Sequence, residues 1–197
     1  MDTEKARRRR GDLAPNPELW AALERGPRLR RIIEDFYRRV YADARLSPFF
    51  ARTTMSWVVD HQYAFLGEIF SGEKMYFGDR PRNAHHRMVI DDDLFDYREE
   101  LMAACLREHG LSAEHVAAWR RVEEAFRPQI VKKAPFPRRR HGVTIPLDGL
   151  GTLEIALACV CDACGGEIEA GARCSYEQDS GRLYCPACSD GLRAEGP

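Results

Sequence analysis

The chain has 197 residues, of which 44% are hydrophobic, enough for one ordinary domain or one compact domain with a small appendage. Its 30 Lys and Arg residues nearly balance its 31 Asp and Glu residues, which excludes the global basic field of a dedicated nucleic-acid binder. No stretch approaches the roughly 20 apolar residues of a membrane span, and none resembles the apolar core of a signal peptide. We therefore expect a soluble, cytoplasmic protein.

Residues 1–16 carry Lys5 and a run of four arginines, Arg7 to Arg10, without apolar periodicity. This pattern predicts a flexible basic arm whose charges are solvated, with a nucleic-acid or lipid contact as the alternative. A short helix is expected next, with Leu19, Trp20 and Leu23 on one side.

Two helical stripes follow, and each contains one polar residue. The first begins near Pro27 and consists of Leu29, Ile33, Phe36, Tyr37 and Val40; the second consists of Val58, Gln62, Phe65, Leu66 and Ile69. Pro48 disfavours a helix between them. Because a polar group on a core-facing stripe needs a partner, Tyr37 and Gln62 either bond each other or serve a ligand.

A loop from Ser71 to Pro81 is expected to lead into a short helix that carries His85 and His86. A histidine in an apolar neighbourhood either ligates a metal or is held by a structural hydrogen bond. Asp91 to Asp93 cap the next helix, which Gly110 ends, with Leu94, Tyr97 or Arg98, Leu101 and Cys105 on its inner line. Ser112 starts a last helix through Val116, Trp119, Glu123, Phe126 and Ile130, kinked near Pro128.

The chain changes character after residue 134. Residues 135–150 begin with Pro-Phe-Pro-Arg-Arg-Arg-His-Gly and are predicted to be a linker. Beyond it, Leu153, Ile155, Leu157 and Cys159 alternate with other residues at the period of a strand. The predicted domains are thus a main helical domain at 17–134 and a small module at 151–197.

Several motifs of the main domain occur in the order and spacing of a known family. From Leu19 to about Ile130 the chain resembles the group-one truncated haemoglobins, which have the two-over-two α-helical globin fold. The resemblance rests on Asp35-Phe36-Tyr37-x-Arg39-Val40, Leu46-Ser47-x-Phe49-Phe50, Met55-Ser56, Gln62, Phe65, Tyr76-x-Gly78, Ala84-His85, Ile90 and Phe95.

The resemblance implies a haem b site. His85 would be the proximal ligand of the iron, and His86, one residue later, would face solvent. Tyr37 and Gln62 would be the distal pair that donates hydrogen bonds to bound dioxygen, beneath an apolar Val58. Phe50 would pack on the haem face. His61 would pair with a haem propionate or act as a sixth iron ligand.

The same resemblance assigns the remaining pocket residues. Tyr76 and Arg80 would share the propionate rim, and the apolar wall would consist of Met55, Phe65, Leu66, Met88, Val89, Ile90 and Phe95. Two departures stand out: the usual Gly-Gly pair after the first helix reads Glu24-Arg25-Gly26-Pro27, and the usual Leu-Gly after the proximal segment reads Met88-Val89. These would alter the first turn and the proximal helix.

Four of the seven cysteines form a C-x2-C-x20-C-x2-C array of Cys161, Cys164, Cys185 and Cys188. This spacing is typical of a closed four-thiolate structural zinc site, and it resembles a zinc ribbon or treble-clef knuckle with a hairpin around residues 173–183. An iron-sulfur or rubredoxin-like iron centre is the alternative. Cys159 and Cys174 are expected to be core thiols.

These features predict a mostly α protein with a small β-rich metal-binding tail. The leading hypothesis is a haem globin that reversibly binds O₂, NO or CO, which the family resemblance extends to nitric-oxide dioxygenation with a reductase partner. A second hypothesis is a gas or redox sensor that acts through the zinc module on a protein or nucleic acid. A globin fold without haem, used for interactions alone, is a third, which Tyr37, Gln62, Phe50 and His85 together disfavour.

Overall fold

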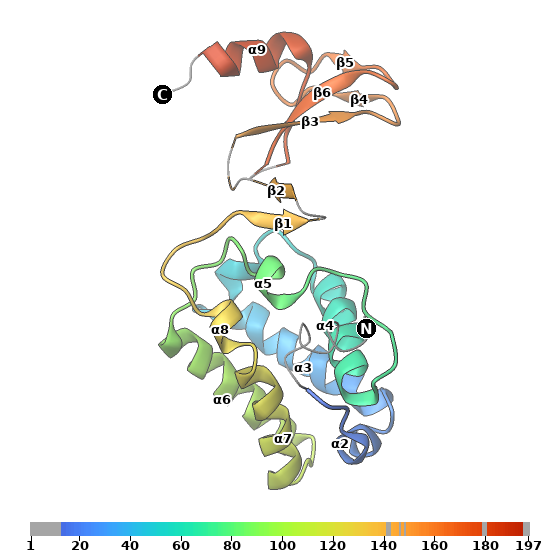
Figure 1. Ribbon diagram of the computed structural model, residues 1–197, viewed down its shortest axis with the longest axis vertical. Coiled ribbons are helices and arrows are strands. Elements are labelled where there is room, and N and C mark those ends of the chain that lie inside the picture. The colour runs from blue at the N-terminus through green and yellow to red at the C-terminus, as the bar shows by residue number, and fades with distance from the viewer. Residues whose placement is uncertain (1–12, 141–142, 146, 148, 179–180, 195–197) are drawn as a thin grey trace, which may run out of the picture. The chain divides into compact units, whose positions relative to one another are not determined.

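The computed structural model describes residues 13–197 except 141–142, 146, 148, 179–180 and 195–197 (Figure 1). Residues 1–12, most of the predicted basic arm, lie outside the described residues. The chain divides into two compact units between Ala134 and Pro135, called here the N-terminal unit and the C-terminal unit. In the part of the chain that is described, none of the helices combines the length and apolar character needed to cross a membrane.

The N-terminal unit is built from helices. They are α2 (Pro17–Ala22), α3 (Pro27–Ala42), the 3₁₀ helix η1 (Ser47–Phe50), α4 (Met55–Ser71), α5 (Pro81–Ala84), α6 (Asp92–Glu108), α7 (Ala113–Glu124) and α8 (Arg127–Ile130). Helix α3 packs on α4 and on α6, and α6 packs on α7, so the fold consists of two pairs of helices (Figure 1).

Side-chain caps explain where several of these helices begin. The carboxylate of Asp91 accepts a hydrogen bond from the Leu94 N–H at 2.8 Å, and the Ser112 hydroxyl accepts one from the His115 N–H at 3.2 Å. Asn16 caps α2 in the same way and Leu13 packs on the core, so residues 13–16 belong to the N-terminal unit and not to the predicted arm.

The predicted last helix is two helices. Helix α7 ends at Glu124 and α8 begins at Arg127, with Pro128 in its first turn, where proline is tolerated. The inner line predicted for α6 was also shifted: its buried residues include Phe95, Met102 and Leu106, while Leu94, Tyr97 and Leu101 are half-buried. Because α6 packs against both α3 and α7, it buries a wider face than one line of residues.

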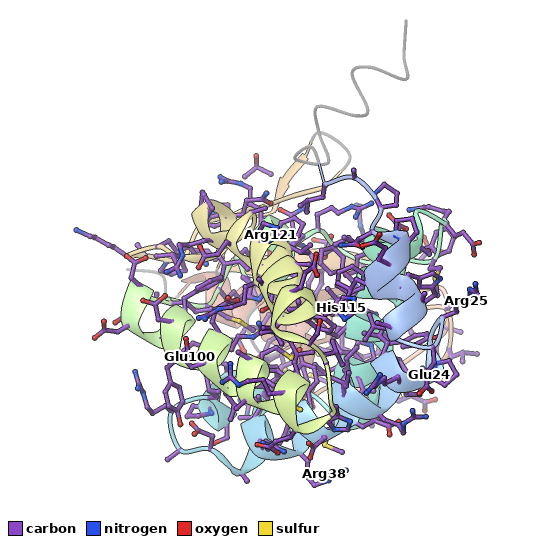
Figure 2. All side chains as sticks on the ribbon, turned by 90° about the horizontal axis from the view of Figure 1, so that it is seen from below. Glu24, Arg25, Arg38, Glu100, His115 and Arg121 are labelled. Atoms are coloured by element: carbon purple, nitrogen blue, oxygen red, sulfur yellow. The ribbon has the colours of Figure 1, made fainter. Side chains whose placement is uncertain are left out.

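The turn after α2 has an unusual backbone. Glu24, Arg25 and Gly26 have φ values of 56°, 51° and 132°, and the first two side chains are labelled at the edge of the unit in Figure 2. Only glycine fits the third position, because a Cβ on Gly26 would lie 2.5 Å from the Tyr63 hydroxyl. This is the altered first turn that the sequence predicted.

A single apolar core fills the N-terminal unit. Its members come from every long helix, and they are Leu19, Leu23, Leu29, Ile32, Ile33, Phe36, Tyr37, Val40, Leu46, Val58, Val59, Leu66, Phe70, Met102, Ala103, Cys105, Leu106, Leu111, Val116, Ala118, Trp119 and Val122. Burial of this many apolar side chains is the dominant favourable contribution to folding.

The C-terminal unit is strand-rich. Its strands are β1 (Arg138–Arg140), β2 (Val143–Ile145), β3 (Leu150–Glu154), β4 (Cys159–Val160), β5 (Glu167–Ile168), β6 (Arg173–Glu177) and β7 (Leu183–Tyr184), and helix α9 (Pro186–Ala194) follows them. All pairings are antiparallel: β1 with β2, β4 with β5, and a three-stranded sheet in the order β3, β6, β7. The β6–β7 hairpin is the one predicted around residues 173–183.

Two predictions for this unit were wrong. The segment 135–150, predicted to be a linker, contains the β1–β2 pair. The strand predicted through Leu153 and Cys159 ends at Glu154, and Leu157 is 82% exposed. Ile155 continues the antiparallel pairing, because its N–H donates to the Ala172 carbonyl and its carbonyl accepts from the Gly171 N–H. The backbone bends at residues 156–157, so the alternating pattern spans two strands and the bend between them.

Candidate functional site

His85 is held as a metal ligand would need to be. It follows the last residue of α5, so it caps the predicted helix instead of lying within it. Its Nδ1 lies 2.8 Å from the Pro81 carbonyl, which requires the hydrogen on Nδ1 and leaves a lone pair on Nε2. Burial lowers the pKa of His85 to about 4, so the ring is neutral at physiological pH. No described residue hydrogen-bonds Nε2.

The backbone around His85 is fixed from two sides. The Lys132 ammonium donates to the His85 carbonyl at 2.7 Å, and the Lys132 N–H donates to the Ile90 carbonyl at 2.9 Å. These bonds tie the proximal segment to the chain that follows α8. His86, the rival ligand, directs its own Nδ1 at the Asn83 carbonyl at 2.7 Å.

Tyr37 lies in the core and keeps its proton. Its side chain is 6% exposed, and its ring makes edge contacts with Phe36 and Phe50, with centroids 5.2 and 5.7 Å apart. Burial raises the pKa of Tyr37 to about 12, although the Arg98 guanidinium opposes this rise. The hydroxyl is therefore a donor at neutral pH, and no residue in the described part of the chain accepts its hydrogen.

Gln62 and Val58 lie one turn apart on α4. Val58 is 8% exposed and Gln62 is half-buried. No hydrogen bond joins the Gln62 amide to Tyr37 or to any other described residue. Of the two options that the sequence left open, mutual bonding between Tyr37 and Gln62 is thus wrong, and both groups remain available to a ligand.

These observations test whether the residues fit a haem. The chain presents an imidazole nitrogen with a free lone pair, a buried hydroxyl donor and an amide donor, all without partners among the described residues. The Tyr37 side chain is buried, and those of His85 and Gln62 are half-buried. Polar groups inside a protein are normally satisfied, so three polar side chains without a partner, in the positions that the family resemblance assigns, fit an iron ligand and a bound gas. The residues of this site therefore fit a haem.

The predicted rim forms one ion-pair network around Glu68, which the sequence reading missed. Glu68 is 5% exposed and accepts from the Tyr76 N–H at 2.9 Å, the Lys74 ammonium at 3.2 Å and the Arg80 guanidinium at 2.9 Å. Burial by itself would raise the pKa of Glu68, but these bonds lower it to about 2. Glu68 thus fixes the loop that carries Tyr76 and Arg80.

His61 lies beside this rim. Its ring stacks on Trp57 with centroids 3.8 Å apart, its Nδ1 is 2.9 Å from the Trp57 carbonyl, and the Tyr76 ring meets it edge-on at 6.3 Å. The nearby Arg80 side chain is 46% exposed. Because the Tyr76 hydroxyl donates to the Asp79 carbonyl at 2.7 Å, the side chains here that suit the carboxylates of a propionate rim are His61 and Arg80.

The predicted wall residues differ in burial. Leu66 and Phe95 are buried; Phe65, Met88 and Ile90 are half-buried, and Phe65 contacts the Tyr76 ring at 5.2 Å. Met55 and Val89 are 36% and 46% exposed. The exposure of Val89 follows from the turn after α5, which opens the segment to solvent.

A buried charged cluster on α6 and α7 was not foreseen. Arg98 pairs with Glu123, lies 3.6 Å from Glu99, and stacks over the Phe36 ring at 4.8 Å. Glu99 is fully buried, and neither of its carboxylate oxygens has a hydrogen-bond partner in the described residues. Burial and the Glu123 carboxylate raise the pKa of Glu99. The sequence signals for this cluster were Glu123 on an otherwise apolar stripe and Arg98 as a candidate for the inner line of α6.

The four cysteines of the C-x2-C pairs converge in the C-terminal unit. Their sulfur atoms all lie within 4.8 Å of one another, and Cys164 Sγ and Cys185 Sγ are 4.0 Å apart. Zn–S bonds of about 2.3 Å in a tetrahedron place sulfurs roughly 3.8 Å apart. The Cys185 and Gly166 N–H groups point at Cys161 and Cys164, each at 3.4 Å, and backbone donors led by Cys185 lower the pKa of Cys161 to about 6.

The two other cysteines of this unit do not join the set. Cys174 is 1% exposed and Cys159 packs beside it in a small core with Ile155, Ile168 and Cys161. Their place in the core is the one predicted. Helix α9, which begins directly after Cys185 and contains Cys188, was not predicted.

Comparison with known proteins places residues 19–131 under the model of the family described as bacterial-like globin. Among curated proteins, the group 1 truncated haemoglobin of Nostoc sp. is 30% identical over 92 residues, 47% of this chain and 78% of that protein. The Synechocystis protein is 35% identical over 43% of this chain and 72% of its own length, and the Tetrahymena thermophila protein is 32% identical over 50% and 81%.

Solved structures agree. The Fe(III) form of the truncated haemoglobin from Tetrahymena pyriformis matches with a TM-score of 0.55 at 28% identity, covering 58% of this chain and 98% of that one. The 2/2 haemoglobin from Synechococcus, solved in the cyanomet state with covalently attached haem, matches with a TM-score of 0.54 at 26% identity over the same shares. Residues beyond 131 lie outside the family match.

Proposed function

Because the chain belongs to the bacterial-like globin family, with group 1 truncated haemoglobins among its relatives, we propose that its N-terminal unit binds haem b through His85 and a diatomic gas beneath Tyr37 and Gln62. Haem, when bound, supplies reversible coordination of O₂, NO or CO. The observation that carries the proposal is the set of three unpaired polar groups, His85 Nε2, the Tyr37 hydroxyl and the Gln62 amide.

On the proximal side, the Pro81 carbonyl sets the tautomer of His85 and the orientation of its ring. A neutral imidazole with its hydrogen on Nδ1 presents a lone pair at Nε2, and the hydrogen bond at Nδ1 makes that lone pair more basic. The Lys132 ammonium on the His85 carbonyl fixes the backbone of the ligand. The His85 ring therefore needs no reorientation to coordinate iron through Nε2.

On the distal side, Tyr37 and Gln62 supply two donors in a largely apolar setting. A gas ligand that carries partial negative charge is stabilised by a fixed donor, and the bond is stronger where water is excluded. Tyr37 keeps its proton because burial raises its pKa to about 12. Val58 contributes bulk and no donor, so the polar role falls on Tyr37 and Gln62.

The C-terminal unit is proposed to bind one Zn²⁺ through Cys161, Cys164, Cys185 and Cys188. The compact sulfur cluster and the two backbone N–H groups directed at the sulfurs support this. Four thiolates saturate a tetrahedral ion and leave no position for substrate, so the role is structural.

The test of the gas-binding proposal is the O₂ dissociation rate of Tyr37→Phe. Loss of a hydrogen bond to a charged acceptor costs about 1.5–3 kcal/mol, so dissociation should accelerate about tenfold to a hundredfold. CO carries less charge, so its dissociation should change little. Tyr41→Phe is the matched control: Tyr41 lies one turn further on α3 and donates to the Thr53 carbonyl at 3.0 Å. Equal O₂ dissociation in wild type and Tyr37→Phe would refute the distal assignment.

A further inference from the structure

Three side chains with different ligand atoms meet between α3 and α6, at the edge of the core. Cys105 and His109 are four residues apart on α6, so they share one face, and Asp35 faces them from α3. Asp35 Oδ2 lies 3.4 Å from Cys105 Sγ and 3.3 Å from His109 Nε2. The three ligand atoms all lie within 4.8 Å of one another.

Asp35 Oδ2 thus lies within hydrogen-bond distance of the Cys105 thiol and the His109 ring, and it also accepts from the Arg39 guanidinium. The Cys105 thiol has a second acceptor in the Ile32 carbonyl, 3.6 Å away. We propose that Asp35, Cys105 and His109 form a binding site for a divalent transition-metal ion, Zn²⁺ being the best fit. The ion would lie between the carboxylate oxygen, the sulfur and the imidazole nitrogen and would displace the thiol hydrogen. An oxygen, a sulfur and a nitrogen ligand suit Zn²⁺, whereas Mg²⁺ and Ca²⁺ require oxygen ligands.

The charges balance. Zn²⁺ adds two positive charges, and the Asp35 carboxylate with a Cys105 thiolate supplies two negative ones. The thiol proton leaves to solvent, and His109 binds the ion through the lone pair of Nε2. Arg39, which bonds Asp35 Oδ2 at 2.7 Å, keeps its second carboxylate partner, Glu108, at 2.5 Å. Arg38 remains on the other oxygen, Asp35 Oδ1, at 2.8 Å.

Burial places the site at an edge that solvent reaches. Cys105 is fully buried, whereas the side chains of Asp35 and His109 are 20% and 25% exposed. An ion can enter beside these two and leave its fourth position to water, the arrangement of three protein ligands and one open site. Arg38, labelled in Figure 2 on the outside of α3, marks this edge.

Zinc binding would displace the thiol proton of Cys105, so the affinity for the ion should rise with pH. The ion would also join α3 to α6, and α3 carries Tyr37, so it would stabilise the helix that bears the distal donor.

The experiment compares zinc content in full-length wild type, Cys105→Ser, His109→Gln and His115→Gln after equilibrium dialysis against free Zn²⁺. His115, labelled on α7 in Figure 2, is a partly exposed histidine outside the cluster and is the matched control. Wild type and His115→Gln should bind one more zinc per chain than the other two. Because each variant keeps the cysteine array, the difference does not depend on what the C-terminal unit binds.

A second readout is the unfolding temperature of the N-terminal unit with and without Zn²⁺, which should rise in wild type and not in His109→Gln. His109 is partly exposed, so this variant stays informative if Cys105→Ser fails to fold. Equal zinc content in wild type and His109→Gln, or no thermal shift in wild type, would overturn the proposal. Neither outcome bears on haem binding by His85.

Discussion

The two units of this chain are stabilised by different means. Among the described residues, the N-terminal unit buries 22 core residues, whereas the separate core of the C-terminal unit has four buried members, and two of these are Cys161 and Cys174. A chain segment this short seldom buries enough apolar surface to fold by itself. We infer that the first unit folds on its core and that the second depends on the metal.

The largest expected effect is therefore the loss of zinc. Treatment with a chelator, or Cys164→Ser, should unfold the C-terminal unit, because structural zinc contributes about 10–16 kcal/mol to such folds. Amide hydrogen exchange should show loss of protection in β6 and β7 while α3, α6 and α7 keep theirs. Continued protection of β6 and β7 without metal would contradict the inference that the C-terminal unit depends on a metal for its fold.

A core truncation tests the other unit. Leu106 is fully buried on α6, so Leu106→Ala should lower the free energy of unfolding of the N-terminal unit by about 2–5 kcal/mol. The matched control is Leu157→Ala, because Leu157 is 82% exposed in the C-terminal unit and should change stability by less than about 0.5 kcal/mol. Denaturant titration followed by circular dichroism measures both, and similar losses in the two variants would contradict the picture of two unlike cores.

The smallest effect concerns the buried acid of α6. Burial and Glu123 raise the pKa of Glu99 in the folded state, so between the unfolded pKa of about 4.3 and the raised folded value the folded chain binds a proton that the unfolded chain does not. Stability from this group is present at low pH and falls as pH rises, by at most about 1.4 kcal/mol per pH unit. Glu99→Gln should flatten this slope in unfolding titrations, with Glu100→Gln, an exposed neighbour labelled in Figure 2, as control.

How far the sequence predicted the structure depended on whether the signal was local. Pro27, Asp91 and Ser112 mark helix starts through their own backbone or capping preferences, and the three helices begin where these residues predicted. The β6–β7 hairpin and the cysteine cluster followed from spacing. The bend at residues 156–157 was missed because the period of two continues through it, while the long-range pairing that ends at Ile155 and Ala172 leaves no mark in the local sequence.

Prediction of the site residues also depended on whether the sequence signal was local. His85, Tyr37 and Gln62 were proposed from the sequence because they interrupt apolar stripes or match a family pattern. The Glu68 network, the Arg98–Glu99–Glu123 cluster and the Asp35–Cys105–His109 cluster were missed, because each joins residues from separate elements. Cys105 and His109 share a helical face at a spacing of four, and Glu123 lies on an apolar stripe. For these two clusters the sequence thus showed the residues of one helix, but not which residues of another helix they would contact.

The most direct test of the central claim is the absorption spectrum of the reduced protein with and without carbon monoxide, in wild type, His85→Ala and His86→Ala. If His85 is the iron ligand, wild type and His86→Ala should show a Soret band that shifts with carbon monoxide, and His85→Ala should lose it. The reverse pattern would contradict the assignment of His85, and a folded wild-type protein that takes up no haem would contradict the haem-globin function itself.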